Sequence, residues 1–369
     1  MKIGIDARMM GKGFGLARYV EQLVTHVLSV DQNNEYVLFL KKEQFLDPHL
    51  LSTTSVPYAK VLADIPWYSL KEQTTFLRIL NKHKVDLMHF PHWNIPYFFH
   101  GSYVVTIHDL TMFHYPRAEA TTLGPVKFWI KDQAHRALLR KIVQKSKHIL
   151  AVSEFTKKDI HETLHVPLSK ITVTYQAPFQ IQHTKKLIAS SEKPYVLYVG
   201  AAYPHKNLET LLMAWGLFQK KYGNAHELVL VGKENYFYEG LKKKFPPDAF
   251  QNTVRYLGFA SDDQLTDLYK SAELFVFPSL YEGFGLPPLE AMAQGVPVLA
   301  SQASCLPEVL KDSALFFDPT NPKAIAESVH TVLENNTLKQ ELIRKGFEHV
   351  KQFSWKELAQ KTIHAYESS

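Results

Sequence analysis

Short apolar runs alternate with longer helical segments along this chain, and that alternation restricts the fold more than any other feature of the sequence. Parallel strands that are buried on both faces have this apolar character, and helices connect them in βαβ units. In the first half the runs are Ile3 to Asp6, Tyr36 to Leu40, Leu87 to Phe90, Tyr103 to Ile107 and Ile149 to Val152. In the second half they are Tyr195 to Val199, Glu227 to Val231, Val254 to Tyr256, Leu274 to Phe277 and Val298 to Ala300. We therefore predict an α/β protein with two doubly wound parallel sheets.

The chain also divides naturally into two domains. A polar stretch from Gln176 to Pro194, with prolines near both ends, is typical of a linker. A length of 369 residues exceeds the size at which one hydrophobic core usually stops growing. We predict one Rossmann-like domain over residues 1–185 and a second over residues 186–352. The last segment, residues 353–369, has an amphipathic helical pattern.

Cysteine usage and hydropathy indicate the cellular compartment. The single cysteine, Cys305, excludes an intrachain disulfide and agrees with a reducing cytoplasm. The amino-terminal residues do not resemble a signal peptide, and no apolar run reaches the roughly 18 residues that a membrane span needs. We expect a cytoplasmic protein, either soluble or peripheral on the inner face of the plasma membrane.

The basic net charge of the chain suggests two kinds of partner, a nucleic acid and an anionic membrane surface. The formal net charge is +6, yet no stripe of basic and stacking aromatic residues belongs to a known nucleic-acid module, so nucleic acid is not expected. The segment from Val126 to Leu150 mixes aromatic with basic residues on a helical pattern. It is consistent with docking on an anionic membrane surface and equally with an ordinary amphipathic helix whose basic face is solvated.

The stretch Tyr281 to Gly295, YEGFGLPPLEAMAQG, places Glu282 and Glu290 on either side of a glycine-rich turn. It follows the last-but-one apolar run, so its residue types predict a strand end, a loop and a helix. Pro288 at a first helical position and Gly295 just past the end would frame that helix.

A ligand class follows from this turn. The glycines of the turn let a ligand approach the backbone, and a helix N-terminus reached through such a loop binds anions, phosphate above all. Carboxylates cannot bind phosphate, but they accept hydrogen bonds from hydroxyl groups. The segment therefore predicts a site for a ligand with both phosphate and several hydroxyls, as a nucleotide sugar has.

The sequence EGFGLPPLE at residues 282–290 resembles the signature of retaining glycosyltransferase family 4, whose members have the two-domain GT-B fold. Other blocks resemble the family in the family's order: KIGIDARM with GLARY, TIHDL, AVSEFTKKDI, YVGAAYPHKNLETLL, LVLVGK, VRYLGF, CLPEVL and ALFFDP. Together they cover most of the chain, and they are similar in particular to mannosyltransferases that build bacterial surface polysaccharides. The resemblance implies two Rossmann-like domains facing a central cleft. It implies that the first binds the acceptor, the second binds the nucleotide sugar, and the helix of residues 353–369 crosses back to the first.

The resemblance also implies roles for matched residues. Lys206 would stabilise the charge that develops on the diphosphate leaving group. Glu290 would bind the ribose diol, and Glu282 would contact the donor sugar. His108, at the end of TIHDL, would hydrogen-bond the sugar or phosphate near the reacting carbon. The expected catalytic residues are His108, Lys206 and Glu282, and the expected donor-binding residues are Gly15, Gly200, His205, Lys206, Gly258, Glu282, Gly283, Phe284, Gly285, Leu286 and Glu290.

The glycine-bearing run GKGFGLARY does not fit the dinucleotide pattern G-x-G-x-x-G. Counted from Gly11 the third glycine is replaced by Leu16, and counted from Gly13 it is replaced by Arg18. The sequence therefore does not support an interpretation of the chain as a dehydrogenase. The loop is expected to let a substrate approach the backbone near Gly13 and Gly15, with Arg18 either contacting phosphate or pairing with a carboxylate.

The chain departs from the family at one point. Many members carry a basic residue where this chain has Ala201 and a second one directly before the lysine, where it has His205. One phosphate contact is therefore missing or comes from elsewhere, as from a protonated His205. No Asp-x-Asp motif is present, so neither a metal nor another cofactor is expected.

The sequence thus predicts a retaining, metal-independent hexosyltransferase. We expect it to move mannose from GDP-mannose to a saccharide or lipid-linked saccharide acceptor in surface-polysaccharide synthesis. A UDP-sugar-dependent transferase of the same fold stays open. So do a sugar-phosphate transfer enzyme, such as a relative of sucrose or trehalose synthases, and a GT-B epimerase that acts on a nucleotide sugar. A subunit that binds nucleotide sugar without turnover is the non-enzymatic alternative. The joint presence of Lys206, Glu282 and Glu290 disfavours that last alternative, while Ala201 keeps it open.

Overall fold

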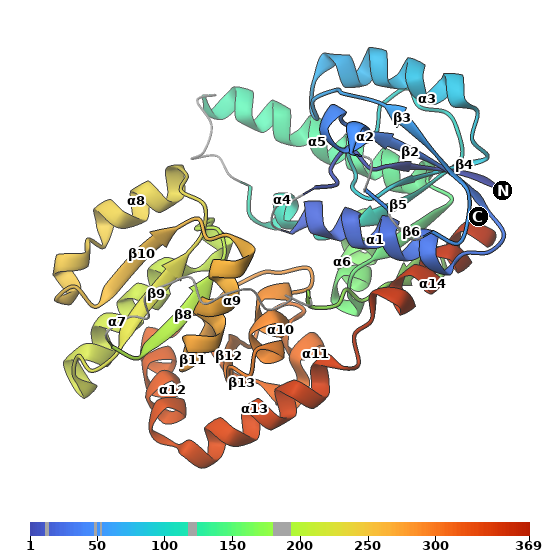
Figure 1. Ribbon diagram of the computed structural model, residues 1–369. Coiled ribbons are helices and arrows are strands. Elements are labelled where there is room, and N and C mark those ends of the chain that lie inside the picture. The colour runs from blue at the N-terminus through green and yellow to red at the C-terminus, as the bar shows by residue number, and fades with distance from the viewer. Residues whose placement is uncertain (12–14, 48–49, 52–53, 117–123, 180–192) are drawn as a thin grey trace. The chain divides into compact units, whose positions relative to one another are not determined.

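The computed structural model describes residues 1–11, 15–47, 50–51, 54–116, 124–179 and 193–369 (Figure 1). The chain forms two compact units. Unit 1 comprises Met1–Leu110, Leu123–Gln176 and Ser354–Ser369, and unit 2 comprises Thr111–Thr122 and Ala177–Phe353. The domain boundary that we predicted at residue 185 lies outside the described residues, as do Gly13 and most of the predicted linker.

Unit 1 is built on a seven-stranded parallel sheet with the strand order β3-β2-β1-β4-β5-β6-β7. Its strands are β1 (Lys2–Asp6), β2 (Glu35–Leu40), β3 (Tyr58–Leu62), β4 (Leu87–Phe90), β5 (Tyr103–Ile107), β6 (His148–Ala151) and β7 (Ile171–Val173). The order reverses between β1 and β4, which pair directly, with Ile3 opposite Leu87. In open sheets of this kind, ligands bind at the carboxyl ends of the strands next to such a reversal.

The helices of unit 1 connect these strands. They are α1 (Leu16–Val30), α2 (Lys42–Leu46), a π-helix (Glu72–Phe76), α3 (Leu77–His83), α5 (Pro125–Lys145), α6 (Glu154–Leu164), a 3-10 turn (Leu168–Lys170) and the C-terminal α14 (Trp355–Glu367). In Figure 1, α14 (red) lies beside α1 (dark blue). The Tyr366 hydroxyl of α14 lies 2.6 Å from Nδ1 of the buried His89 in β4. This hydrogen bond ties the end of the chain into the core of unit 1.

Unit 2 repeats the scheme with a six-stranded parallel sheet in the order β10-β9-β8-β11-β12-β13. The strands are β8 (Tyr195–Val199), β9 (Glu227–Val231), β10 (Val254–Gly258), β11 (Leu274–Phe277), β12 (Val298–Ser301) and β13 (Leu315–Phe317). Here the order reverses between the paired strands β8 and β11. The prediction of two doubly wound parallel sheets is therefore confirmed.

The helices of unit 2 are short or of medium length. They are α4 (Thr111–His114), α7 (Leu208–Tyr222), α8 (Tyr236–Lys244), α9 (Asp262–Ser271), α10 (Leu286–Ala293), α11 (Leu306–Leu310), α12 (Pro322–Glu334) and α13 (Asn336–Val350), with 3-10 turns at Pro204–Lys206, Pro247–Phe250 and Lys311–Ser313. Helix α10 begins two residues before Pro288, so that residue is not at the first helical position as we predicted. Gly295 does follow the end of α10 and has φ 75°.

Candidate active site

Lys206 and Glu282 meet at the carboxyl edge of the unit 2 sheet, beside the reversal in strand order. Lys206 comes from the turn that follows β8, and Glu282 comes from the loop that follows β11. The Lys206 Nζ and Glu282 Oε1 atoms are 2.6 Å apart, and both side chains are mostly buried. The two loops are also joined through the backbone, since the Leu280 amide donates to the His205 carbonyl at 2.7 Å. Two of the predicted catalytic residues therefore form one charge pair.

Asn207 holds this pair in place, and our sequence predictions gave it no role. Its backbone is left-handed, with φ 61°, a conformation that asparagine tolerates better than most residues. Its side-chain amide donates to the carbonyls of Pro278 at 3.1 Å and Pro319 at 2.8 Å. An asparagine directly before a helix was the available signal, because asparagine is common at helix N-caps.

Ser304 is a second contact that the sequence did not reveal. Its hydroxyl accepts a hydrogen bond from the Glu282 amide at 3.0 Å, and its own φ is 52°. The loop after β12 thus fixes the backbone of Glu282 from one side while Lys206 holds the carboxylate from the other. The Glu282 carboxylate is therefore positioned before any ligand binds.

The glycine-rich turn leads into α10 through Gly285, the N-cap, which has φ 90° and no capping side chain. A Cβ atom at Gly285 would lie 2.8 Å from Leu306 Cδ2, so a side chain there requires Leu306 to shift and strains the backbone. Pro287 and Pro288 carry no N–H group. The N–H groups of this turn therefore belong to the residues up to Leu286, in which we predicted a phosphate and sugar cradle.

Glu290 lies within α10, where only 6% of its surface is exposed. It is the fifth residue of the helix, two positions further along than it would be with Pro288 as the first helical residue, because α10 begins at Leu286. The hydroxyl of the fully buried Tyr269 donates to Glu290 Oε2 at 3.1 Å. This hydrogen bond from α9 fixes the carboxylate, and Tyr269 is another residue that sequence patterns did not single out.

Three glycines bring the ends of β8, β9 and β10 close together. The Gly232 amide donates to the Gly258 carbonyl at 2.9 Å, and Gly258 has φ 72°. A Cβ at Gly232 would lie 2.0 Å from the Gly200 carbonyl oxygen. The predicted ligand residues Gly200 and Gly258 therefore have a packing role at this edge, whether or not they also contact a ligand.

His205, which we considered as a phosphate contact, is buried, with 4% of its surface exposed. Its ring stacks on Tyr203 at 5.9 Å and lies 6.0 Å from the ring of Tyr115. Tyr115 directly follows α4. Both belong to unit 2, although they come shortly after β5 of unit 1 in the chain. His205 therefore lies in an aromatic cluster rather than on an open surface.

His108 lies at the carboxyl end of β5 in unit 1. Its Nε2 donates to the Pro91 carbonyl at 2.9 Å, which fixes the ring, and its Nδ1 lies 3.5 Å from the Gln176 side-chain amide. Burial lowers the pKa of His108, an effect that the Pro91 hydrogen bond and Asp109 oppose. The geometry leaves Nδ1, which has only this long contact, as the ring atom that can accept from a ligand hydroxyl.

The first glycine loop is described only in part. Gly15 caps α1 with φ 62°, and a methyl group there would meet no described atom within 4 Å. Arg18, in the first turn of α1, is buried. The described residues thus leave the backbone at Gly15 open to approach, as its predicted contact with a ligand requires.

Helix α5 carries the aromatic and basic residues for which we considered a membrane surface. Val126, Trp129 and Ile130 are 70%, 63% and 56% exposed, and Lys127 and Lys131 beside them are exposed as well. None of the helices in the described part of the chain is long and apolar enough to cross a membrane. Among the described residues, no group of three or more histidine, cysteine or carboxylate side chains is placed to hold a metal ion.

Comparison with known proteins identifies the family of each half. Residues 15–177 match the family model described as glycosyltransferase family 4, and residues 179–349 match the model described as glycosyl transferases group 1. The O-antigen chain mannosyltransferase B of Escherichia coli is 31% identical over 296 residues, which cover 78% of this chain and 75% of that protein. The O-antigen chain mannosyltransferase RfbU of Salmonella typhimurium is 29% identical over 286 residues, covering 77% of this chain and 75% of that protein.

Solved structures show the same architecture. Sucrose-phosphate synthase from Thermosynechococcus elongatus aligns with a TM-score of 0.74 at 20% identity, covering 99% of this chain and 98% of that chain. At this identity the likeness establishes the fold alone. Together with the sequence relatives, it shows that the chain belongs to glycosyltransferase family 4 and has the two-domain GT-B fold.

Proposed function

We propose that this glycosyltransferase moves mannose from GDP-mannose to a saccharide or lipid-linked saccharide acceptor in surface-polysaccharide synthesis, with retention of anomeric configuration and without a metal. The observation that carries the proposal is the Lys206–Glu282 pair, which lies at the edge of the unit 2 sheet where α/β proteins bind their ligands. Similarity to two O-antigen mannosyltransferases supports mannose as the sugar.

Each part of the donor has a chemically suited partner in this proposal. Lys206 and the amides of the Gly283 to Leu286 turn stabilise the departing diphosphate, and the lysine supplies the positive charge that a metal would bring in other transferases. Glu290 accepts hydrogen bonds from the ribose diol, because a carboxylate can accept two at once. Glu282 orients the sugar, and its carboxylate exchanges the contact with Lys206 for contacts with the sugar hydroxyls when the donor binds.

The transfer step needs no side-chain nucleophile. The acceptor hydroxyl forms a bond to the anomeric carbon on the face from which the diphosphate departs, and the bond from that carbon to the phosphate oxygen breaks. The departing phosphate oxygen takes the acceptor proton. His108 Nδ1 accepts a hydrogen bond from a sugar hydroxyl in place of its long contact with Gln176.

A membrane-bound acceptor would give the exposed face of α5 a use. Val126, Trp129 and Ile130 present apolar surface, and Lys127 and Lys131 present positive charge next to it. Exposed apolar and basic side chains on one helix can both contribute to binding anionic headgroups. We therefore extend the proposal to peripheral association with the inner face of the plasma membrane, which co-sedimentation with phosphatidylglycerol vesicles tests.

The donor is tested with a panel of GDP-, UDP- and ADP-sugars in the presence of EDTA. Slow hydrolysis of GDP-mannose, together with thermal stabilisation by that nucleotide sugar above the others, is the expected result. Preference for a UDP-sugar would replace the proposed donor, and loss of activity in EDTA would overturn metal independence. Release of free nucleotide and an epimerised sugar would indicate an epimerase, and stabilisation without hydrolysis or transfer to any saccharide would indicate a binding subunit.

A further inference from the structure

Four aromatic rings form a continuous row within unit 1, beginning at the carboxyl ends of β4 and β5. The row starts at His108, whose ring centroid lies 6.4 Å from that of His92. His92 lies 4.7 Å from Trp93, and Trp93 lies 5.8 Å from Tyr68. The ring of His135, from α5, packs edge-on against Trp93 at 4.5 Å. The row thus connects the histidine that we place near the reacting sugar to the exposed Tyr68.

Tyr68 has two features that core packing does not explain. The residue is 65% exposed, and its backbone is left-handed, with φ 59°. A non-glycine residue in this conformation is strained, and such residues persist where the surrounding structure holds them. The Tyr68 amide donates to Glu72 Oε2 at 3.0 Å, which fixes the strained residue.

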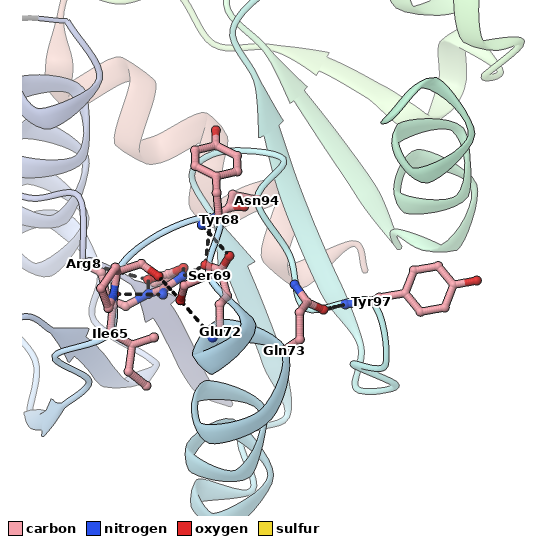
Figure 2. A network of polar contacts seen from close by, with 10 residues as sticks. Arg8, Ile65, Tyr68, Ser69, Glu72, Gln73, Asn94 and Tyr97 are labelled. Carbon is pink, nitrogen blue, oxygen red and sulfur yellow. Dashed lines mark hydrogen bonds and ion pairs between the residues drawn. The ribbon is translucent and has the colours of Figure 1, made fainter. Parts of the chain in front are cut away.

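A buried polar network sets the geometry of the row (Figure 2). Glu72, only 1% exposed, accepts from Arg8 at 2.7 Å and from the Asn94 side-chain amide at 2.7 Å, in addition to the Tyr68 amide. One carboxylate therefore holds the segment after β1, the segment that carries Tyr68 and the segment that carries Trp93. Figure 2 shows the Tyr68 ring pointing away from this network, so the ring remains accessible.

Glu72 also begins a π-helix, Glu72–Phe76, a deviation from α-helical geometry that is frequent at functional sites. The following residue, Gln73, accepts a hydrogen bond from the Tyr97 amide at 2.7 Å, which adds a further tie to the loop after β4 (Figure 2). Rigid support of this kind is what a binding surface needs in order to hold a ligand in one geometry.

The rings of the row are uncharged, and this favours a sugar over a phosphate as the ligand. Burial and the neighbouring His108 and His135 lower the pKa of His92 to about 3, and burial lowers the pKa of both neighbours as well. Arg8 is fully buried and pairs with Asp6 and Glu72, so its charge is compensated. None of these rings carries a positive charge that could bind a phosphate, although Lys131 and Arg136 of α5 lie near enough to His135 to lower its pKa further. Aromatic faces and neutral imidazoles instead match the C–H faces and hydroxyls of a sugar.

His92 adds a polar atom to the row. Its Nδ1 is buried and has no hydrogen-bond partner among the described residues. A buried polar atom without a partner is costly unless a ligand or water satisfies it. A sugar hydroxyl that binds beside Trp93 can satisfy this nitrogen.

We propose that the row from His108 to Tyr68 binds the acceptor saccharide, with Tyr68 and Trp93 stacking against a sugar residue beyond the one that receives mannose. This inference rests on the proposed function and adds an acceptor subsite to it. The enzyme then recognises acceptor length, and a longer saccharide binds more tightly than a single sugar residue, for which mannosides serve as the probes. Glu72 is a positioning residue for this subsite, since it holds the loops that carry both rings.

The test compares three variants with the wild-type chain. Tyr68→Gly removes the ring and relieves the left-handed backbone, so it is expected to fold, and Tyr68→Phe keeps the ring. Leu70→Ala is the matched control, since Leu70 is 85% exposed and lies two residues away. The probes are methyl α-mannoside and α-linked mannotriose as acceptors, with slow donor hydrolysis without acceptor as the measure of the donor site. Mannotriose binding without donor, followed by saturation-transfer NMR, gives a readout that does not depend on turnover.

In Tyr68→Gly we expect KM for mannotriose to rise about tenfold, while KM for methyl α-mannoside and donor hydrolysis stay unchanged. Tyr68→Phe and Leu70→Ala should match the wild type. Equal KM values for mannotriose in Tyr68→Gly and the wild type would overturn the inference, and so would equal affinity of the wild type for the two acceptors. Both results leave donor hydrolysis, and with it the proposed function, intact.

Other outcomes separate the two proposals further. If the wild type hydrolyses no donor but binds mannotriose through Tyr68, the subsite stands and the proposed transfer fails. If Tyr68→Gly loses binding to phosphatidylglycerol vesicles but keeps mannotriose binding, the row is a lipid contact and the inference is wrong.

Discussion

The Nζ of Lys206 and the Oε1 of Glu282 lie 2.6 Å apart, although 76 residues separate them in the chain. The pair joins the turn after β8 to the loop after β11, which are the two loops at the reversal of strand order in unit 2. A diphosphate that binds Lys206 competes with Glu282 for the ammonium group. Donor binding would therefore release the carboxylate toward the sugar hydroxyls, so one contact links recognition of both halves of the donor.

Removing either partner should abolish most of the activity. In Lys206→Ala we expect turnover to fall at least about a hundredfold, because electrostatic stabilisation of a leaving group is worth that much at a single site. In Glu282→Ala we expect a fall of about a hundredfold as well, because the sugar is no longer held in the reactive orientation. Each variant should also lose about 1–3 kcal/mol of unfolding free energy, since the remaining charge is partly buried without its partner. Initial rates and urea unfolding measure the two effects.

The double variant Lys206→Ala/Glu282→Ala separates structure from chemistry. Its unfolding free energy should exceed the value expected from adding the two single losses, because no unpaired charge remains. Its turnover should stay as low as that of the worse single variant. Normal turnover in either folded single variant would show that the pair is structural only.

Tyr269→Phe tests the role of Glu290. The substitution removes the hydroxyl that donates to the Glu290 carboxylate at 3.1 Å and leaves the ring in place. Hydrogen bonds to charged groups contribute about 1.5–3 kcal/mol, so we expect donor KM to rise about tenfold with little change in kcat. Nucleotide-sugar titrations followed by thermal stabilisation check the affinity directly.

Tyr195→Phe is the matched control for this substitution. Tyr195 is also buried in unit 2, and its hydroxyl donates to the Leu268 carbonyl at 2.7 Å, one residue before Tyr269. Both variants should lose stability, and only Tyr269→Phe should weaken donor binding. Equal donor affinity in the two variants would argue against Glu290 as a ligand for the donor.

Much of the fold could be predicted from apolar runs, and what was missed has a physical cause. The boundaries of β4, β5, β8, β9 and β11 match the predicted runs, because these strands are buried on both faces or nearly so. Strands β3, β7 and β13 were not predicted. They are edge strands in their sheets, and β3 and β13 are only partly buried. Lys60 interrupts the apolar run of β3, and β7 and β13 are three residues long, shorter than the runs from which we predicted strands.

The sequence picked out candidate site residues one by one, but it did not predict how they are arranged. Lys206 and Glu282 came from two separate blocks, and no pattern in the sequence implied that they form an ion pair. The supporting residues Asn207 and Ser304 act through left-handed backbones and hydrogen bonds to distant loops. Such contacts depend on tertiary structure, so local sequence patterns carry no signal for them.

Gly285→Ala tests whether the N-terminus of α10 tolerates a side chain. The new Cβ would lie 2.8 Å from Leu306 Cδ2, and the backbone at φ 90° is unfavourable for alanine. We expect a loss of about 1–3 kcal/mol of unfolding free energy and a loss of stabilisation by nucleotide sugars. Denaturant unfolding with and without GDP-mannose measures both effects.

Gly240→Ala is the control for this change. Gly240 lies inside α8, where a Cβ would meet nothing within 4 Å. Alanine there should stabilise the protein by about 0.5–1 kcal/mol, because glycine is unfavourable in a helix interior. A Gly285→Ala variant that gained stability in the same way, and still bound GDP-mannose, would contradict the tight approach at α10.

His89 should make stability depend on pH. It is fully buried between the Tyr366 hydroxyl at 2.6 Å and the Thr106 hydroxyl at 2.9 Å. Burial, with a smaller effect of the neighbouring His108, lowers the pKa of His89 from 6.5 to about 3. Between these two pH values the unfolded chain takes up a proton that the folded chain does not bind. The contribution of His89 to the unfolding free energy is therefore complete above pH 6.5. It is lost as the pH falls, at up to about 1.4 kcal/mol per pH unit.

His89→Gln removes this titration, so the unfolding free energy of the variant should fall less steeply than that of the wild type between pH 6.5 and pH 4. Carboxylates that protonate in the same range are common to both proteins and cancel in the comparison. Tyr366→Phe is the control, because it removes the partner of His89 Nδ1 and leaves the histidine in place. It should lower stability at every pH and keep the wild-type slope. An unchanged slope in His89→Gln would mean that His89 takes up its proton without unfolding, so that burial does not hold it neutral.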